Sequence, residues 1–98
     1  MSATGTWRIT AQTPVGERTS TVELTETDGR LEGRMTDPEQ APIYDGRVKG
    51  GEVEWHVDIT QPMALKLHAT GTLDGDTITG KIKAGMLFPS AAFTAQRV

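Results

Sequence analysis

The stretch Val53-Glu54-Trp55-His56-Val57-Asp58-Ile59 decides the fold, because apolar and polar residues alternate through all seven of its positions. Such an alternation predicts a β-strand with one face in a core and the other in water. Two-residue turn signals flank it at Gly50-Gly51 and Asp74-Gly75. Turns of this kind join neighbouring antiparallel strands into hairpins. The region Gly46–Lys83 therefore predicts an antiparallel meander built around this central strand.

The rest of the chain continues the same pattern, and no helical period competes with it. At 98 residues the chain has room for one core, so we expect a single domain over residues 1–98. An Asp-Gly pair recurs at Asp28-Gly29, Asp45-Gly46 and Asp74-Gly75, which we interpret as repeated hairpin chemistry. The eight predicted strands are Thr6–Thr13, Arg18–Thr27, Arg30–Thr36, Pro42–Lys49, Glu52–Thr60, Met63–Leu73, Asp76–Ala84 and Ala91–Val98.

A correct hairpin pairs inward residues with inward residues, and this condition predicts the register. The predicted pairs are Val22 with Met35, Leu24 with Gly33, Val48 with Val53, Gly46 with Trp55, Tyr44 with Val57, Gly71 with Ile78, Ala69 with Gly80, Leu67 with Ile82, Trp7 with Leu24, Ile9 with Val22, and Ile82 with Phe93. Inward glycines that face larger residues favour a tightly curved sheet. The sequence therefore predicts an all-β fold, an eight-stranded antiparallel up-and-down barrel.

Composition excludes several classes of protein. A net charge of −3 with interspersed acids and bases argues against a nucleic-acid or anionic-membrane surface, and the lack of cysteine removes disulfides and thiolate metal sites. The sequence shows neither a signal-peptide pattern nor an apolar run of membrane length, so we expect a soluble, cytoplasmic protein. It shows no catalytic triad order, phosphate loop or close carboxylate pair, and we expect no cofactor.

The first and last strands carry a further pattern, Gly5-Thr6-Trp7 together with Arg97. It resembles the calycin pattern of lipocalins, fatty-acid-binding proteins and avidins, in which a Gly-x-Trp and a late arginine meet at the closed end of a barrel. The resemblance implies that Arg97 stacks on Trp7, a cation–π contact that covers the barrel floor. This chain lacks the helices of lipocalins and fatty-acid-binding proteins, so no biotin, retinoid or fatty-acid site is implied. It is also similar to short bacterial proteins that consist of a single barrel.

The two ends of the predicted barrel differ. One end carries the tight turns and both termini, and the other carries the longer connections. Met86, Leu87, Phe88 and Met63 fall in those connections, although loops are normally polar. They predict either an apolar mouth for a small hydrophobic ligand or side chains that cap the core or an oligomer interface.

The register places the candidate ligand-binding residues inside the barrel toward that mouth. Tyr44 and Ser20 are the polar groups among them, and Tyr44 is also a weak catalytic candidate as a hydrogen-bond donor; a buried tyrosine bonded to backbone is the commoner case. Ile43 and Tyr44 cannot both face inward without a bulge near Asp45. The predicted ligand-binding residues are Ser20, Met35, Tyr44, Val57, Ile59, Met63, Leu65, Ile82, Met86 and Phe88, with Trp7 and Arg97 as structural residues.

His56 and His68 fall on the outer face of adjacent strands. One register sets them opposite each other with Asp58 near Lys66, and another sets His68 against Glu54. Outward histidines are usually solvated, so we expect no metal site. Glu26 is inward near the closed end, where pairing with Arg97 or fraying into solvent is expected.

Three functional hypotheses remain from the sequence. The leading one is a barrel that binds a small hydrophobic molecule through the loop end. The alternatives are a small barrel enzyme, an isomerase, cyclase or lyase that uses Tyr44 as an acid, and a structural or interaction barrel with a filled core. A homo-oligomer is possible, and it would use the loop end or an edge with Ile43, Met86 and Phe88.

Overall fold

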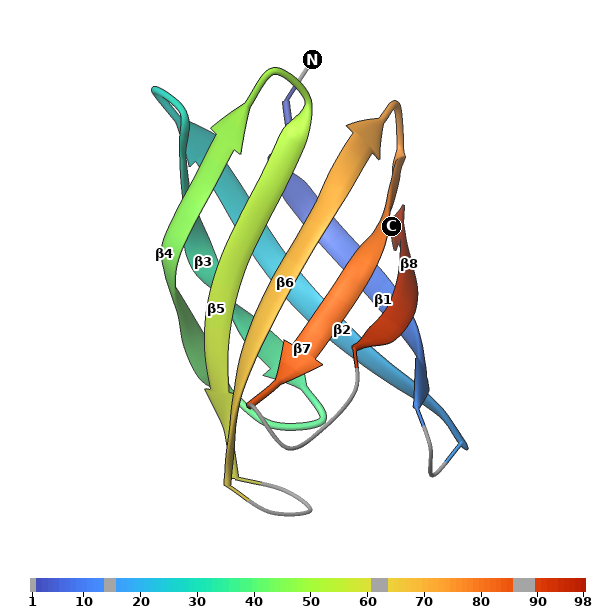
Figure 1. Ribbon diagram of the computed structural model, residues 1–98. Coiled ribbons are helices and arrows are strands. Elements are labelled where there is room, and N and C mark those ends of the chain that lie inside the picture. The colour runs from blue at the N-terminus through green and yellow to red at the C-terminus, as the bar shows by residue number, and fades with distance from the viewer. Residues whose placement is uncertain (1, 14–15, 61–63, 86–89) are drawn as a thin grey trace.

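The protein is an eight-stranded antiparallel closed barrel whose strands follow one another in sequence order (Figure 1). The computed structural model describes residues 2–13, 16–60, 64–85 and 90–98. Each predicted strand is present with its ends within two residues of the prediction, so the predicted fold class and topology are confirmed. The strands are β1 (Gly5–Thr13), β2 (Gly16–Thr27), β3 (Arg30–Asp37), β4 (Ala41–Lys49), β5 (Glu52–Ile59), β6 (Leu65–Asp74), β7 (Thr77–Ala84) and β8 (Ala91–Arg97).

The barrel closes where β1 pairs with β8. This ladder runs from Trp7 opposite Arg97 to Ala11 opposite Phe93. Every other strand pairs with its neighbours in sequence. Closure therefore brings the first and last strands side by side, as Figure 1 shows for the blue and red ribbons.

The two ends of the barrel differ as predicted. The turns at Asp28-Gly29 and Gly50-Gly51 have positive φ at both residues, which is the signature of a type I′ hairpin turn. In Figure 1 these turns and the β6–β7 turn lie at the upper end, where the N-terminus also lies. The strand ends that the other four connections join lie at the opposite end, which we call the loop end.

Some predicted registers are confirmed and others are off by two residues, whereas the predicted pairs Tyr44–Val57 and Gly46–Trp55 fail because of a bulge in β4. Leu24 pairs with Gly33 and Val48 with Val53, as predicted. Trp7, however, pairs with Val22, because β2 already begins at Gly16 and the β1–β2 connection is two residues shorter than expected. A shift of two residues keeps every side chain on its own face, since the side chains of a strand alternate with a period of two. The fold prediction was therefore unaffected.

The ladders on both sides of β7 show the same two-residue shift. Gly71 pairs with Gly80, not Ile78, and Gly80 also pairs with Phe93. A Cβ on Gly71 would lie 2.7 Å from the Thr79 carbonyl oxygen and 3.3 Å from Phe93 Cζ, and one on Gly80 would meet the backbone of Thr70, so the two strands approach closely at this pair. Phe93 meets Trp55 edge to face, with ring centroids 6.0 Å apart. The β6–β7 shift arises because Asp74 pairs with Thr77, which makes Gly75-Asp76 the turn residues instead of Asp74-Gly75.

The core fills the barrel with apolar side chains. Among the described residues, every fully buried one is either hydrophobic or a glycine. The buried hydrophobic residues are Ala3, Trp7, Ile9, Ala11, Val22, Leu24, Leu31, Met35, Ala41, Ile43, Val53, Trp55, Val57, Ala69, Leu73, Ile78, Phe93 and Ala95.

The closed end has the floor that the sequence predicted. The guanidinium carbon of Arg97 lies 4.5 Å from the centroid of the Trp7 indole, so the predicted stack is confirmed. Trp7 Nε1 donates to the carbonyl of Ala3 at 2.9 Å, and Arg97 Nε donates to Asp76 Oδ1 at 2.7 Å. Gly5 has φ +147°, and a Cβ there would lie 2.9 Å from Arg97 Nη1. The glycine of Gly-x-Trp thus gives the arginine room to cover the indole.

The segment before β1 lies across this floor. Arg97 donates to the carbonyls of Ser2, at 2.9 Å, and Thr4. Glu26 Oε1 accepts a hydrogen bond from the Ala3 amide at 2.8 Å. Glu26 therefore anchors the N-terminal segment, and the expectations that it pairs with Arg97 or frays into solvent are wrong.

Candidate functional site

The outer face of β4 carries a bulge that changes the position of Tyr44. Tyr44 pairs with His56, but the next regular pair is Arg47 with Glu54, so Asp45 and Gly46 together stand opposite the one residue between them. Asp45 has φ 51°, in the left-handed region. A bulge of this kind re-aims the side chains on either side of it.

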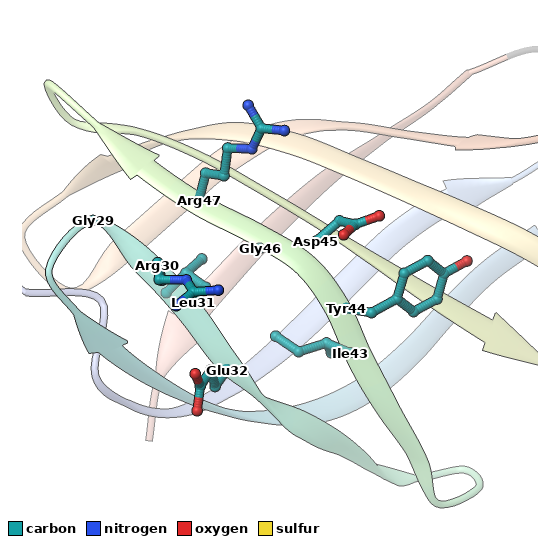
Figure 2. A pocket seen from close by; sticks show the side chains of 9 residues that line it. All are labelled: Gly29, Arg30, Leu31, Glu32, Ile43, Tyr44, Asp45, Gly46 and Arg47. Carbon is teal, nitrogen blue, oxygen red and sulfur yellow. The ribbon is translucent and has the colours of Figure 1, made fainter.

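The prediction that Tyr44 faces the barrel interior is wrong. Ile43 is 8% exposed and belongs to the core, whereas Tyr44 is 38% exposed. Figure 2 shows Tyr44 and Asp45 pointing to the same side of β4 and Ile43 pointing to the other. The extra residue lets Tyr44 and Asp45 both face outward while Ile43 and Val48 keep their inward positions. Ile43 is therefore also unavailable for the predicted oligomer edge.

On the outside, Tyr44 is held by a carboxylate. Its hydroxyl donates to Asp58 Oδ1 at 2.6 Å. This hydrogen bond raises the pKa of Tyr44 above its ordinary value of 10.0, and partial desolvation and the negative charges of Asp58 and Asp45 raise it further. Tyr44 is therefore a neutral phenol whose proton is already engaged, and it does not act as an acid inside the barrel.

Tyr44 begins a row of stacked rings across three strands. Its ring centroid lies 5.4 Å from that of His56 with an interplanar angle of 24°, and His56 lies 4.1 Å from His68 with an angle of 6°. The row runs from β4 through β5 to β6, and the register sets Lys83 of β7 next to His68. We call Tyr44, His56 and His68 the aromatic row.

Acidic residues fix both ends of the aromatic row. Glu54 Oε2 lies 3.0 Å from His68 Nε2, which donates because a carboxylate only accepts. Glu54 Oε1 also lies 3.8 Å from Arg47 Nε. The register that sets His56 opposite His68 and Asp58 opposite Lys66 is confirmed, and the one that pairs His68 with Glu54 is wrong. The side chain of His68 still reaches Glu54 diagonally.

The aromatic row does not have the geometry of a metal site. Nearly parallel imidazole rings turn their faces toward each other, so their nitrogen lone pairs do not converge on one point. In the described parts of the chain, no group of three or more His, Cys, Asp or Glu residues is placed to hold a metal ion. His56 Nδ1 is buried and has no hydrogen-bond partner in the structure.

Two hollows adjoin Tyr44, one on each side of β4. The first, about 470 Å³ in volume, opens between β3 and β4 (Figure 2). It is lined by Gly29, Arg30, Leu31, Glu32, Ile43, Tyr44, Asp45, Gly46 and Arg47. The second, about 230 Å³ in volume, lies over β5 to β7 and is lined by Tyr44, His56, Lys66, Leu67, His68, Lys83 and Gly85. The first lining mixes two arginines with two acids, whereas the second contains two lysines and no acid.

The other predicted ligand-binding residues lie inside the barrel or outside the described part of the chain. Met35 and Val57 are buried, and Ser20, Ile59, Leu65 and Ile82 are partly buried. Ser20 pairs with the buried Ile9, which places it on the inner face. Met63, Met86 and Phe88 lie outside the described residues. The six interior residues stay predictions for ligand binding.

Sequence reasoning placed the two histidines outside but missed their neighbours Tyr44 and Lys83. The signal for Tyr44 was present, because Ile43 and Tyr44 are consecutive large apolar residues followed by Asp45-Gly46 within a strand. The sequence raised a bulge near Asp45, and an Asp-Gly pair inside a strand supports one, but we interpreted the pair as another hairpin signal and kept Tyr44 inward.

The described part of the chain contains no helix with the length and apolar character needed to cross a membrane. No family model matches the chain, and no curated protein matches its sequence.

Proposed function

We propose that the protein is a calycin-like barrel that binds a small apolar molecule at its loop end. The observation that carries this proposal is a group of partly exposed apolar side chains on the inside of the barrel at the loop end. Near the tight turns, the inward residues Trp7, Leu73 and Ile78 are buried, and toward the loop end Met35 and Ala41 are buried as well. Four inward apolar side chains of β5, β6 and β7, however, stay partly exposed toward the loop end. These residues are Ile59, Leu65, Leu67 and Ile82.

Apolar side chains that face inward and still contact solvent provide a surface on which an apolar molecule can be buried. Val48 is a partly buried apolar residue at the tight-turn end, but it has no similar neighbours on the adjacent strands. Each 100 Å² of apolar surface removed from water contributes about 2.5 kcal/mol before association costs are subtracted. A small ligand of this kind would therefore bind with micromolar to millimolar affinity.

The calycin assignment rests on the closed end. A Gly-x-Trp on the first strand and an arginine on the last meet there in a cation–π contact. A floor of this kind leaves the opposite end as the entrance. The enzyme alternative loses its main support, because Tyr44 is outside the barrel and its hydroxyl is bound to Asp58.

Titration with an uncharged fluorescent probe, N-phenyl-1-naphthylamine, tests the proposal. We expect a saturable fluorescence increase and amide chemical-shift changes at Ile59, Leu65 and Ile82. Leu65→Ala should weaken binding severalfold, because it removes apolar contact area. Val48→Ala is the matched control, since it truncates a partly buried apolar residue at the other end, and it should leave affinity unchanged. Shifts confined to the tight turns, or no saturable binding, would leave the filled structural barrel as the function.

A further inference from the structure

The hollow of about 230 Å³ over β5 to β7 is lined mainly by outward side chains, with the inward residue Leu67 at its border, and it has a chemistry of its own. The β5–β6 and β6–β7 registers place Lys66 opposite Asp58 and Lys83 opposite His68, so the two lysines border the aromatic row from different strands. Neither lysine forms an ion pair with a described residue. The hollow thus combines two free ammonium groups with aromatic rings.

The acids near the aromatic row are already engaged. Asp58 accepts the hydrogen bond from Tyr44, and Glu54 is shared between His68 and Arg47. Neither acid lines the hollow. The acids hold the rings in place, and although Asp58 stands opposite Lys66, no carboxylate of the described residues lies within ion-pairing distance of either ammonium group.

We propose that this hollow binds a small planar anion of the aromatic carboxylate class. The carboxylate would be held between the ammonium groups of Lys66 and Lys83, and the planar body would lie against the aromatic row. Lysine pairs with anions as a point charge, and aromatic rings prefer to stack on or meet the edge of another flat ring. The hollow is smaller than the cavities that hold drug-sized ligands, which suits a molecule with a single ring.

Other ligand classes fit the hollow less well. An apolar molecule would have to bury two ammonium groups that have no ion-pair partner, which is costly. A nucleic acid needs an extended basic surface, whereas this chain has net charge −3. The parallel imidazoles are not arranged to share a metal ion.

The experiment is an amide chemical-shift titration of the protein with sodium benzoate. We expect saturable shifts that cluster at Lys66, Leu67, His68, Lys83 and Gly85. Benzyl alcohol keeps the ring without the charge, and acetate keeps the carboxylate without the ring. Both should bind at least about tenfold more weakly than benzoate, a difference of about 1.4 kcal/mol.

Variants locate the site. Combined Lys66→Gln and Lys83→Gln substitutions should weaken benzoate binding by about tenfold or more, again about 1.4 kcal/mol. Lys81→Gln is the matched control, because Lys81 is exposed on the same strand as Lys83 but does not line the hollow. His68→Ala should weaken benzoate more than acetate, because only benzoate uses the ring.

Three results would overturn the proposal. They are equal weakening by Lys81→Gln, equal binding of benzoate and acetate, and shifts confined to Ile59, Leu65 and Ile82. The last result would assign benzoate to the loop end and so support the proposed function while removing this second site. Conversely, benzoate binding at this hollow without any binding of N-phenyl-1-naphthylamine would support this second site and contradict the proposed function.

Discussion

Tyr44 shows how one residue acquires its environment from the backbone beneath it. It is the only tyrosine in the chain, and its hydroxyl makes a hydrogen bond of 2.6 Å to Asp58. The bond holds the phenol beside His56 and keeps it neutral, because ionisation would place a second negative charge against the carboxylate. A single tyrosine also makes the phenol directly measurable.

We predict that tyrosinate absorbance will titrate with a midpoint above the ordinary tyrosine value of about 10. Asp58→Asn should lower the midpoint, because it removes the hydrogen-bonded carboxylate and its charge. Asp45→Asn is the control and should lower it less, since Asp45 acts through charge alone. The raised pKa also stabilises the fold below the unfolded value, and this contribution is lost as pH rises through the folded value. An unchanged midpoint in Asp58→Asn would contradict the role of the bond.

Gly5 has a comparable importance at the closed end. It adopts φ +147°, and a Cβ would lie 2.9 Å from Arg97 Nη1, whereas Gly16 adopts φ +110° with nothing within 4 Å. Both backbones resist an L side chain, but only Gly5 supports the contact between Arg97 and Trp7.

We therefore predict that Gly5→Ala will lower the free energy of unfolding by about 1–3 kcal/mol more than Gly16→Ala does. Urea denaturation measures both. In an Arg97→Ala background the difference should largely vanish, because the displaced group is gone. Equal losses for the two glycines in the wild-type background would show that Arg97 simply moves aside.

At the scale of elements, the bulge in β4 comes from one extra residue. Between the pairs Leu31–Gly46 and Arg34–Pro42, three β4 residues face two β3 residues. The β4–β5 ladder shows the same excess, because Asp45 and Gly46 face a single residue. Without Asp45, both ladders would be continuous, with Ile43 still inward and Tyr44 still outward. This one extra residue thus interrupts the hydrogen-bonded ladder between β3 and β4.

We predict that deletion of Asp45 will give a folded protein whose free energy of unfolding stays within about 1–2 kcal/mol of wild type. The variant gains ladder hydrogen bonds and loses a non-glycine residue with positive φ, but it also loses local curvature. Hydrogen exchange should show stronger protection of the Glu32 and Tyr44 amides, because the ladder between β3 and β4 becomes continuous.

Deletion of Glu54 is the matched control for the Asp45 variant. Glu54 lies in an unbroken ladder with β6, so its removal turns part of β5 over and should prevent folding. If deletion of Asp45 is equally disruptive, the bulge supplies curvature that the barrel needs.

The sequence predicted the strands correctly, but it did not predict the details of pairing between strands, namely the register of β7 and the side that Tyr44 faces. Alternation with a period of two identified each strand and, apart from the bulged part of β4, its inward face, and a two-residue slip preserves both. The slip between β6 and β7 arose because the turn uses Gly75-Asp76, whereas the sequence offered Asp74-Gly75 as an equally good turn. Tyr44 was wrongly placed inside the barrel, because the bulge adds one residue and so exchanges the inward and outward positions before it. The outer hollow needed four strands in register, so it followed only from the assembled sheet.

At the scale of the whole molecule, the closed end and the loop end differ in structure. Trp7, Arg97 and the N-terminal segment close the first. The partly exposed inward residues lie toward the second, and the aromatic row occupies the outer wall between them.

The positions of the chain ends have a practical consequence. Val98 N donates to the carbonyl of Thr6 at 2.8 Å, and Ser2 accepts from Arg97, so both ends of the chain meet at the closed end. Immobilising the molecule on a sensor through a tag at either terminus would therefore leave the loop end pointing into the flowing solution. A fluorescent protein fused at the same end would label the barrel without sterically blocking either of its candidate ligand sites.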